Sequence, residues 1–297
     1  MQPLLIPLPG NEDFAAALAD RMGSPLGTAE FRRLPDGETY VRAQEKPSVR
    51  DRHVILVCSF FPANEKVIPV MFLAGALRDL GAKRIGLVCP YLAYLRQDRR
   101  KHPGEALSAA YVARWLSGWV DWLVTIEPHV REASGLSALY SIPARSLSAA
   151  VPISSWIRSH IKKPVLIGPD EGSRAQLDAL ARAGGFPYKI LEKMRLGDRA
   201  VEVQAGDLTG ISDHTPVIVD DIISTGGTMI DTVRRLKEAG LSPPTCIGVH
   251  GIFAEGAYDR LKDAGASQIV TCNTIPHPSN EIDVVTEIAD ALSDGLD

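Results

Sequence analysis

Two adjacent carboxylates, Asp220 and Asp221, end an apolar run in the stretch VIVDDIISTGGTMIDT, residues 217–232. The apolar run predicts a buried strand, and the residues from 228 onward predict a helix. Ligands of open parallel sheets bind beyond the carboxyl ends of the strands, which is where both aspartates fall. Two acids at a buried strand end cost desolvation energy unless partners compensate for it. This favours a binding site over an ordinary strand end.

The loop after these aspartates has the composition of a phosphate site. Gly226 and Gly227 let the backbone turn sharply and come close to a ligand. N–H groups at the start of the next helix converge on one point, where an anion is favoured, and the hydroxyls of Ser224, Thr225 and Thr228 add donors. The nearby carboxylates suit sugar hydroxyls or Mg²⁺. Together these features predict a phosphorylated sugar as ligand, and the absence of a Walker loop excludes nucleotide binding of the P-loop kind.

A basic cluster follows another predicted strand, in the stretch YLAYLRQDRRKHPGE over 91–105. A short charge run is usually a solvated turn, but this one lies beyond the carboxyl end of a strand, where the sheet binds ligands. Guanidinium groups placed there would bind a polyphosphate through paired hydrogen bonds. The cluster comprises Arg96, Gln97, Asp98, Arg99, Arg100 and Lys101.

The elements that position these residues follow from an alternation of short apolar runs and helical patterns. Continuous apolar strands between helices predict an α/β fold with parallel sheets covered on both faces. A chain of 297 residues with this pattern predicts two domains, 1–146 and 147–297, because small residues and two prolines interrupt the pattern near 143–152. Strands are predicted at 52–59, 84–91, 122–128, 164–170, 188–193, 216–221, 245–253 and 268–274, and helices at 64–82, 105–119, 172–185, 228–240 and 254–265.

Composition restricts the class of protein. The formal net charge of −4 gives no general attraction to nucleic acid or to anionic membranes. The four cysteines lie far apart, at 58, 89, 246 and 272, so neither a zinc site nor a redox motif is indicated. The N-terminal residues do not resemble a signal peptide, and no apolar run approaches 18 residues. A cytoplasmic location is expected.

The segments RQDRR and VDDIISTGGT together resemble the ribose-phosphate diphosphokinase family, the phosphoribosyl diphosphate (PRPP) synthetases. The similarity extends from RRLPDGETYVR (32–42) to TCNTIPHP (271–278). It implies two parallel-sheet domains of the type I phosphoribosyltransferase kind, with ATP on the N-terminal side at their interface and ribose 5-phosphate in the C-terminal domain. It also implies a magnesium-dependent reaction in which the ribose 1-hydroxyl attacks the β-phosphorus of ATP and AMP leaves.

The resemblance also implies roles for individual residues. The LPDGE loop, with Asp36 and Glu38, would reach the adenine of a neighbouring subunit, which implies a homo-oligomer, a dimer or a hexamer. Lys193 and Arg195 would begin a flexible catalytic loop. Further ATP ligands would be Arg96, Gln97, Asp98, Arg99 and His129; metal ligands would be His129 and Asp170; ribose 5-phosphate ligands would be Asp220, Asp221, Ser224, Thr225, Gly226, Gly227 and Thr228.

Several positions depart from the family pattern and indicate a divergent member. An aromatic residue is usual at Leu34, a lysine at Ala110, Asp-Leu at Glu127-Pro128, glycine at Ser173 and an acid at Ser224. Two alternatives therefore stay open at this stage, a phosphoribosyltransferase and a non-catalytic regulatory paralogue of the synthetase.

Overall fold

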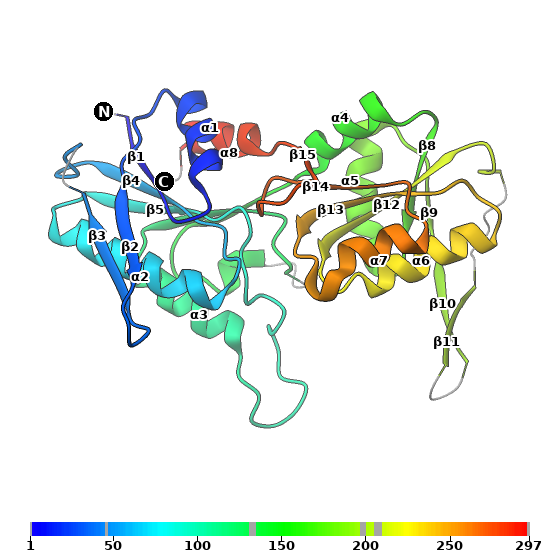
Figure 1. Ribbon diagram of the computed structural model, residues 1–297, viewed down its shortest axis with the longest axis horizontal. Coiled ribbons are helices and arrows are strands. Elements are labelled where there is room, and N and C mark those ends of the chain that lie inside the picture. The colour runs from blue at the N-terminus through cyan, green and yellow to red at the C-terminus, as the bar shows by residue number, and fades with distance from the viewer. Residues whose placement is uncertain (1, 45–46, 131–134, 197–199, 205–209, 296–297) are drawn as a thin grey trace. The chain divides into compact units, whose positions relative to one another are not determined.

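The computed structural model describes residues 2–44, 47–130, 135–196, 200–204 and 210–295, and for 192–196 and 200–204 it describes the backbone alone. The chain divides into two compact units (Figure 1). The first comprises residues 1–148, 274–276 and 285–297, and the second comprises 149–273 and 277–284. The C-terminal helix α8 (Val285–Ser293) thus belongs to the first unit, where it packs against α1 (Glu12–Met22). The predicted division after residue 146 places this helix in the second domain, because it does not include the return of the chain to the first unit.

The first unit is built on a five-stranded sheet whose neighbouring strands are all parallel. A separate antiparallel hairpin joins β2 (Ala29–Arg33) to β3 (Thr39–Ala43). The sheet order is β1 (Leu4–Pro7), β4 (His53–Val57), β5 (Arg84–Val88), β6 (Trp122–Ile126) and β7 (Ala144–Leu147), and the remaining helices are α2 (Asn64–Asp79), α3 (Ser108–Ser117) and the 3₁₀ turn η1 (Gly135–Ala138). The strands β1, β4, β5 and β6 are mostly apolar and buried, as expected for a sheet covered on both faces, whereas the edge strand β7 has two exposed residues.

The second unit is built on a six-stranded parallel sheet. The apolar faces of its helices pack on the strands; in α6, for example, Met229, Val233 and Leu236 belong to the core. The sheet order is β15 (Asn280–Ile282), β14 (Gln268–Cys272), β13 (Thr245–Gly251), β12 (Thr215–Ile223), β8 (Pro164–Gly168) and β9 (Tyr188–Ile190). The helices are α4 (Ala150–His160), α5 (Arg174–Gly184), α6 (Gly227–Glu238) and α7 (Ala257–Ala264), with 3₁₀ turns η2 (Glu171–Ser173) and η3 (Ala254–Gly256).

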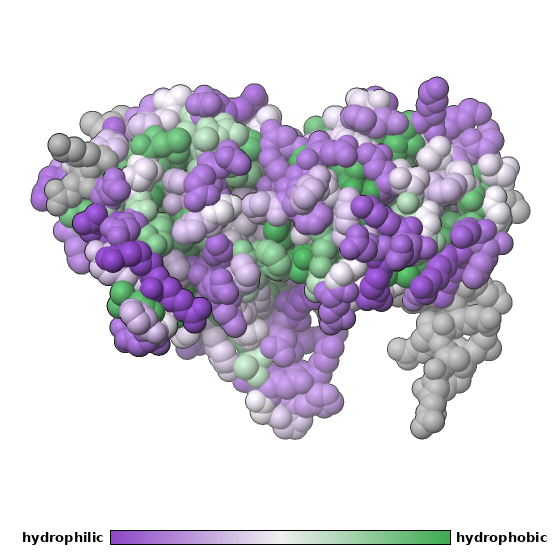
Figure 2. Space-filling view, viewed as in Figure 1, coloured by the Kyte–Doolittle hydropathy of each residue, from purple (hydrophilic) through white to green (hydrophobic). Residues whose placement is uncertain are grey.

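The two parallel α/β sheets confirm the predicted fold class. All four cysteines, Cys58, Cys89, Cys246 and Cys272, are buried and free. Among the described residues, no helix combines the length and the apolarity that crossing a membrane requires. The face of the molecule in Figure 2 is mostly hydrophilic, with apolar side chains in small scattered areas.

The first segment of the first unit ends at Ser148, inside the range 143–152 in which the boundary was predicted. This range contains β7 and the start of α4, and Pro152 lies in the first turn of that helix, where a missing N–H is tolerated. One local prediction is wrong. Lys193 and Arg195 do not begin a loop but lie on β10 (Glu192–Leu196), which pairs with β11 (Ala200–Gln204) as an antiparallel ribbon. The alternating sequence AVEVQ of β11 supplies the pairing partner that the loop interpretation overlooked.

Candidate functional site

The aspartates of the opening motif lie near the carboxyl end of the central strand β12, where both are partly buried. The backbone N–H of Asp221 donates to Oδ1 of Asp220 at 3.0 Å. Burial raises the pKa of Asp220 to about 7, and the neighbouring charge of Asp221 and the charge of Asp170 act in the same direction. A carboxyl group with its pKa raised in this way is best stabilised as an anion by a bound cation or by hydrogen-bond donors.

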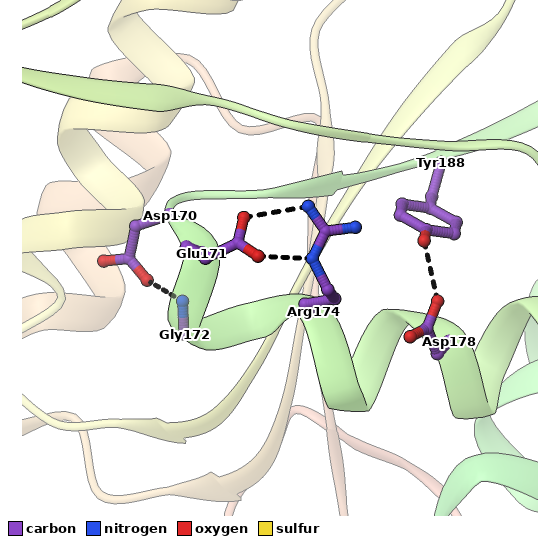
Figure 3. Close-up of polar contacts among 6 residues, drawn as sticks. All are labelled: Asp170, Glu171, Gly172, Arg174, Asp178 and Tyr188. Carbon is purple, nitrogen blue, oxygen red and sulfur yellow. Dashed lines mark hydrogen bonds and ion pairs between the residues drawn. The ribbon is translucent and has the colours of Figure 1, made fainter.

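Asp170 belongs to the same group of acids. It follows β8, which lies beside β12 in the sheet with Ile167 opposite Ile218, so the two strand ends meet at one edge. One oxygen of Asp170 accepts from the N–H of Gly172 at 3.0 Å, which fixes the side chain at the start of η2 (Figure 3). The adjacent Glu171 is instead paired with Arg174, through a contact to Nε and one of 2.9 Å to Nη2.

The loop between β12 and α6 has the geometry expected of a phosphate site. Gly226 adopts a left-handed conformation with φ of 71°, and its carbonyl accepts from the N–H of Ile230 at 2.8 Å, in the first turn of the helix. A Cβ atom at Gly226 would meet Ala257 at 3.4 Å, whereas one at Gly227 would meet no described atom within 4 Å. The start of α6 is therefore open on the side of Gly227, where its N–H groups favour an anion.

The hydroxyl residues of this loop are accessible, since Thr225 and Thr228 are exposed and Ser224 is partly buried. The structure thus brings together the predicted residues Asp170, Asp220 and Asp221 with the loop 224–228 at one edge of one sheet. Within the described parts of the chain, no three His, Cys, Asp or Glu side chains form a complete metal cage. This donor set fits Mg²⁺, which usually takes one or two carboxylates and completes its shell with water and substrate phosphates.

The basic cluster lies in the first unit, in the irregular segment between β5 and α3, and its arginines are exposed. Glu105 organises this segment: its carboxylate accepts from the N–H groups of Lys101 at 2.6 Å and His102 at 3.1 Å, and its carbonyl accepts from Nε of Arg100 at 2.9 Å. These backbone hydrogen bonds lower the pKa of Glu105. A helix was predicted to start at Glu105, whereas α3 starts at Ser108, so this role of Glu105 was not predicted.

The segment is also tied to α3. The N–H of Ala109 donates to the carbonyl of Gln97 at 3.3 Å, and Oγ of Ser108 donates to Oε1 of Gln97 at the same distance. Gln97 therefore holds the basic segment against the start of α3, in addition to any contact it makes with a ligand.

His129 follows β6, the strand next to β5 in the sheet, with Val88 opposite Val124. Its side chain is partly buried, and the preceding Glu127 accepts from Oγ of Ser148 at 2.7 Å. His129 and the basic cluster thus follow neighbouring strands at the same edge of the first sheet.

Asp36 and Glu38 do not follow a strand of the first sheet. They lie in the exposed turn of the separate β2–β3 hairpin. The N–H of Glu38 donates to Oδ1 of Asp36 at 3.1 Å, and the carbonyl of Glu38 accepts from Leu34 at 2.8 Å. The side chains of Lys193 and Arg195 fall outside the described residues, so only the position of their backbone on β10 is known.

Comparison with known proteins agrees with both halves of the structure. Residues 4–119 match the N-terminal domain of ribose phosphate pyrophosphokinase, and residues 136–288 match the phosphoribosyl transferase domain. The chain is 32% identical to the ribose-phosphate pyrophosphokinase of Methanobrevibacter smithii, over 96% of this chain and 98% of the relative. It is 33% identical to the corresponding enzyme of Methanothermobacter thermautotrophicus, over 98% and 100%.

A solved structure gives the same result for the fold. The crystal structure of phosphoribosylpyrophosphate synthetase from Mycobacterium smegmatis superposes with a TM-score of 0.84 at 25% identity, over 99% of this chain and 98% of that chain.

Proposed function

The chain belongs to the ribose-phosphate pyrophosphokinase family, and from this premise we propose which of its residues carry out the reaction. The enzyme transfers the diphosphoryl group of ATP to the 1-hydroxyl of ribose 5-phosphate and forms PRPP and AMP. A bond forms between the sugar oxygen and the β-phosphorus, the bond from that phosphorus to the α-phosphate oxygen breaks, and the hydroxyl proton is lost.

The ribose 5-phosphate site is proposed at the carboxyl edge of the second sheet. The observation that carries this assignment is the pair Asp220–Asp221 beside the open start of α6. The loop of Ser224, Thr225, Gly226, Gly227 and Thr228 would bind the 5-phosphate through N–H and hydroxyl donors. The two carboxylates would accept hydrogen bonds from the ribose hydroxyls.

Mg²⁺ is the proposed cofactor, and Asp170 is its proposed ligand in the second unit. His129 is proposed to bind Mg²⁺ or the phosphates of ATP at the edge of the first sheet. When bound, the ion would neutralise charge on the phosphate oxygens of ATP. The raised pKa of Asp220 supports a cation near the acids, because a nearby positive charge would restore its ionised form.

The ATP site is proposed at the carboxyl edge of the first sheet. Arg96 and Arg99 would bind the polyphosphate, with Gln97 and Asp98 as further ATP ligands. Gln97 would also hold the segment that carries the arginines. Lys193 and Arg195, on β10, would stabilise the charge that develops on the transferred group and on the AMP leaving group.

A homo-oligomer is proposed as the working assembly, since Asp36 and Glu38 would act on the adenine of a neighbouring copy. An apolar surface on the first unit supports this. On α2, Ile68 and Phe72 are exposed one helical turn apart, and on α3 Tyr111 and Trp115 repeat the pattern, with Phe72 at 49% and Trp115 at 56% exposure. A helix that is apolar on both faces normally has both faces covered.

These two helices are neighbours, and the hairpin lies close to them. Arg78 at the end of α2 forms an ion pair of 2.9 Å with Asp121, just beyond α3, and α2 packs against β3. A second copy seated on this surface would therefore lie next to the hairpin that carries Asp36 and Glu38.

The assembly is tested by sedimentation of the wild-type protein and of Phe72→Asp. We expect at least a dimer that dissociates, and loses activity, in the variant. A fully active wild-type monomer would rule the proposal out.

The reaction itself is tested by incubation with ATP, Mg²⁺ and ribose 5-phosphate. AMP is expected only when the sugar is present; ATP binding without AMP would indicate a regulatory paralogue. Calorimetry on Asp220→Ala and Asp221→Ala tests the sugar site. Both substitutions should weaken the binding of ribose 5-phosphate far more than the binding of ATP. The control is Asp213→Ala, because Asp213 pairs with Lys163 at 2.8 Å at the other end of the sheet. It should weaken the binding of neither substrate.

A further inference from the structure

Three aromatic rings lie beside the phosphate loop in the second unit, and none of them is among the predicted site residues. Phe253 follows β13, Tyr258 lies in the first turn of α7, and His277 follows β14. Each ring contacts the other two: the centroids are 4.5 Å apart for Phe253 and His277, 5.2 Å for Phe253 and Tyr258, and 5.1 Å for Tyr258 and His277. All three side chains are only partly buried, and Phe253 and Tyr258 pack against the core of the second unit.

The backbone of Phe253 is held in an unfavourable conformation. Its φ of 49° is left-handed, as is that of Glu255 at 55°. A bulky side chain adopts this region rarely, and such strain persists only where the surroundings impose it, often at functional sites. Here the phenyl ring packs over Gly251, where a Cβ atom would lie 2.6 Å from it.

This conformation connects Phe253 to the phosphate loop. The N–H groups of Ile252 and Phe253 both donate to the carbonyl of Ile223, at 3.0 and 2.9 Å. Ile223 is the last residue of β12 and directly precedes Ser224. A second contact lies on α7, where Ala257 is the neighbour that a Cβ at Gly226 would meet. The residue before the loop is therefore hydrogen-bonded to the segment that carries Phe253 and Tyr258, and the glycine turn of the loop packs against the same segment.

The rings of Tyr258 and His277 also contact residues outside this group of three. The Nζ atom of Lys262 lies 4.2 Å from the ring centre of Tyr258. Nδ1 of the His277 ring accepts from the backbone N–H of Ser279 at 3.1 Å, and the backbone N–H of His277 donates to Oδ1 of Asn280 at 2.9 Å. Burial lowers the pKa of His277, which favours the neutral ring that this acceptor role requires.

We propose that Phe253, Tyr258 and His277 form a buttress that positions the phosphate loop for ribose 5-phosphate. They are positioning residues, since they act through the carbonyl of Ile223 and through Ala257 and need not touch the substrate. The inference rests on the proposed ribose 5-phosphate site. Displacement of the loop would weaken the binding of ribose 5-phosphate but not that of ATP, because ATP is proposed to bind mainly at the first unit.

The test compares three substitutions of Phe253. Phe253→Leu removes the ring and keeps a side chain in the left-handed region; Phe253→Gly removes the ring and relieves the strain; Phe253→Tyr keeps the ring. The matched control is Phe186→Leu, because Phe186 also packs over a glycine, Gly184, but at the amino-terminal edge of the same sheet.

We expect Phe253→Leu and Phe253→Gly to raise the KM for ribose 5-phosphate about tenfold, with kcat and the KM for ATP nearly unchanged. Phe253→Tyr should stay within about twofold of wild type. Phe186→Leu should lower the thermal midpoint without changing either KM. If Phe253→Leu does not fold, His277→Gln provides the second measurement, with a smaller selective rise in the same KM.

An unchanged KM for ribose 5-phosphate in a folded Phe253→Leu or Phe253→Gly protein would overturn the buttress, as would equal changes in both KM values. Failure of the underlying site looks different. In that case Asp220→Ala would also leave ribose 5-phosphate binding intact. If Asp220→Ala weakens ribose 5-phosphate binding while the Phe253 variants keep the wild-type KM, the buttress alone is rejected.

Discussion

The N–H of Asp221 donates to a carboxylate oxygen of Asp220 at 3.0 Å, so the two acids are held together at the end of β12. This hydrogen bond offsets part of the cost of placing two negative charges side by side, but burial still raises the pKa of Asp220 to about 7. The ligand-free site is thus under electrostatic strain, which a bound cation or sugar would relieve.

The first prediction concerns stability and pH in the metal-free protein. An unfolded Asp titrates near pH 3.9, so between about pH 4 and pH 7 the folded state holds a proton that the unfolded state has lost. The free energy of unfolding therefore falls as the pH rises through this window. Asp220→Asn lacks the charge, and its stability relative to wild type should increase by about 1–3 kcal/mol from pH 5 to pH 8.

Urea unfolding in EDTA at both pH values measures this difference. Asp213→Asn is the control; Lys163 lowers the pKa of Asp213, so any trend should be weak and opposite in sign. A stability difference between Asp220→Asn and wild type that does not vary with pH would contradict the prediction.

The second prediction separates two adjacent glycines. Gly226→Ala should destabilise the protein by about 1–2 kcal/mol, because position 226 has a left-handed φ of 71° and Ala257 lies 3.4 Å from the added methyl group. Gly227→Ala should leave stability nearly unchanged, since its methyl group points into open space at the start of α6. That space is where the phosphate is proposed to bind, so Gly227→Ala should raise the KM for ribose 5-phosphate. Thermal unfolding and kinetics on both variants check this; equal behaviour of the two would count against the loop geometry.

Much of the fold was predictable because a buried parallel strand is apolar along its whole length. The strands β4, β5, β6, β8, β12, β13 and β14 all carry such runs. Edge strands are different: β7 has two exposed residues in its four, and β15 has three residues in all. Neither provides enough apolar sequence to stand out from a loop, and both were missed, as were β1, α1, the β2–β3 hairpin, α4 and α8.

The geometry of the candidate site was predictable where one short segment contains it, as in residues 220–228. It was not predictable where residues distant in sequence meet. The rings of Phe253 and His277 come from the ends of different strands, and their contact depends on β13 and β14 being neighbours. Glu105 was missed for a different reason: its helical-looking surroundings concealed a local contact with the backbone of the basic cluster.

The third prediction concerns Glu105. Two backbone N–H groups donate to the same oxygen of Glu105, Oε2. Glu105→Gln keeps one acceptor oxygen but loses the negative charge that strengthens both hydrogen bonds. The loop with Arg96 and Arg99 should then sample more conformations, and the KM for ATP should rise about threefold to tenfold while kcat changes little. Steady-state kinetics with either substrate varied measure this, with Glu12→Gln at the start of α1 as the control. An equal rise in the KM for ribose 5-phosphate would argue for general damage instead.

The fourth prediction concerns Lys193. Its backbone lies on the ribbon β10–β11, outside the six-stranded sheet. If its cation serves mainly the transition state, Lys193→Ala should lower kcat and leave both KM values nearly unchanged. Loss of one preorganised donor typically reduces turnover by a factor on the order of 10²–10³.

The competing view is that Lys193 is an ordinary surface charge, whose removal changes stability by less than about 0.5 kcal/mol and leaves turnover alone. Lys162→Ala shows how such a residue behaves, since Lys162 is exposed just before β8, at the amino-terminal edge of the sheet. Turnover numbers and thermal midpoints for the two variants separate these views. A Lys193→Ala enzyme with the turnover of wild type would place the catalytic cations elsewhere in the chain, whereas low turnover with an unchanged midpoint would assign the ribbon to the chemical step, because a fold defect would lower both.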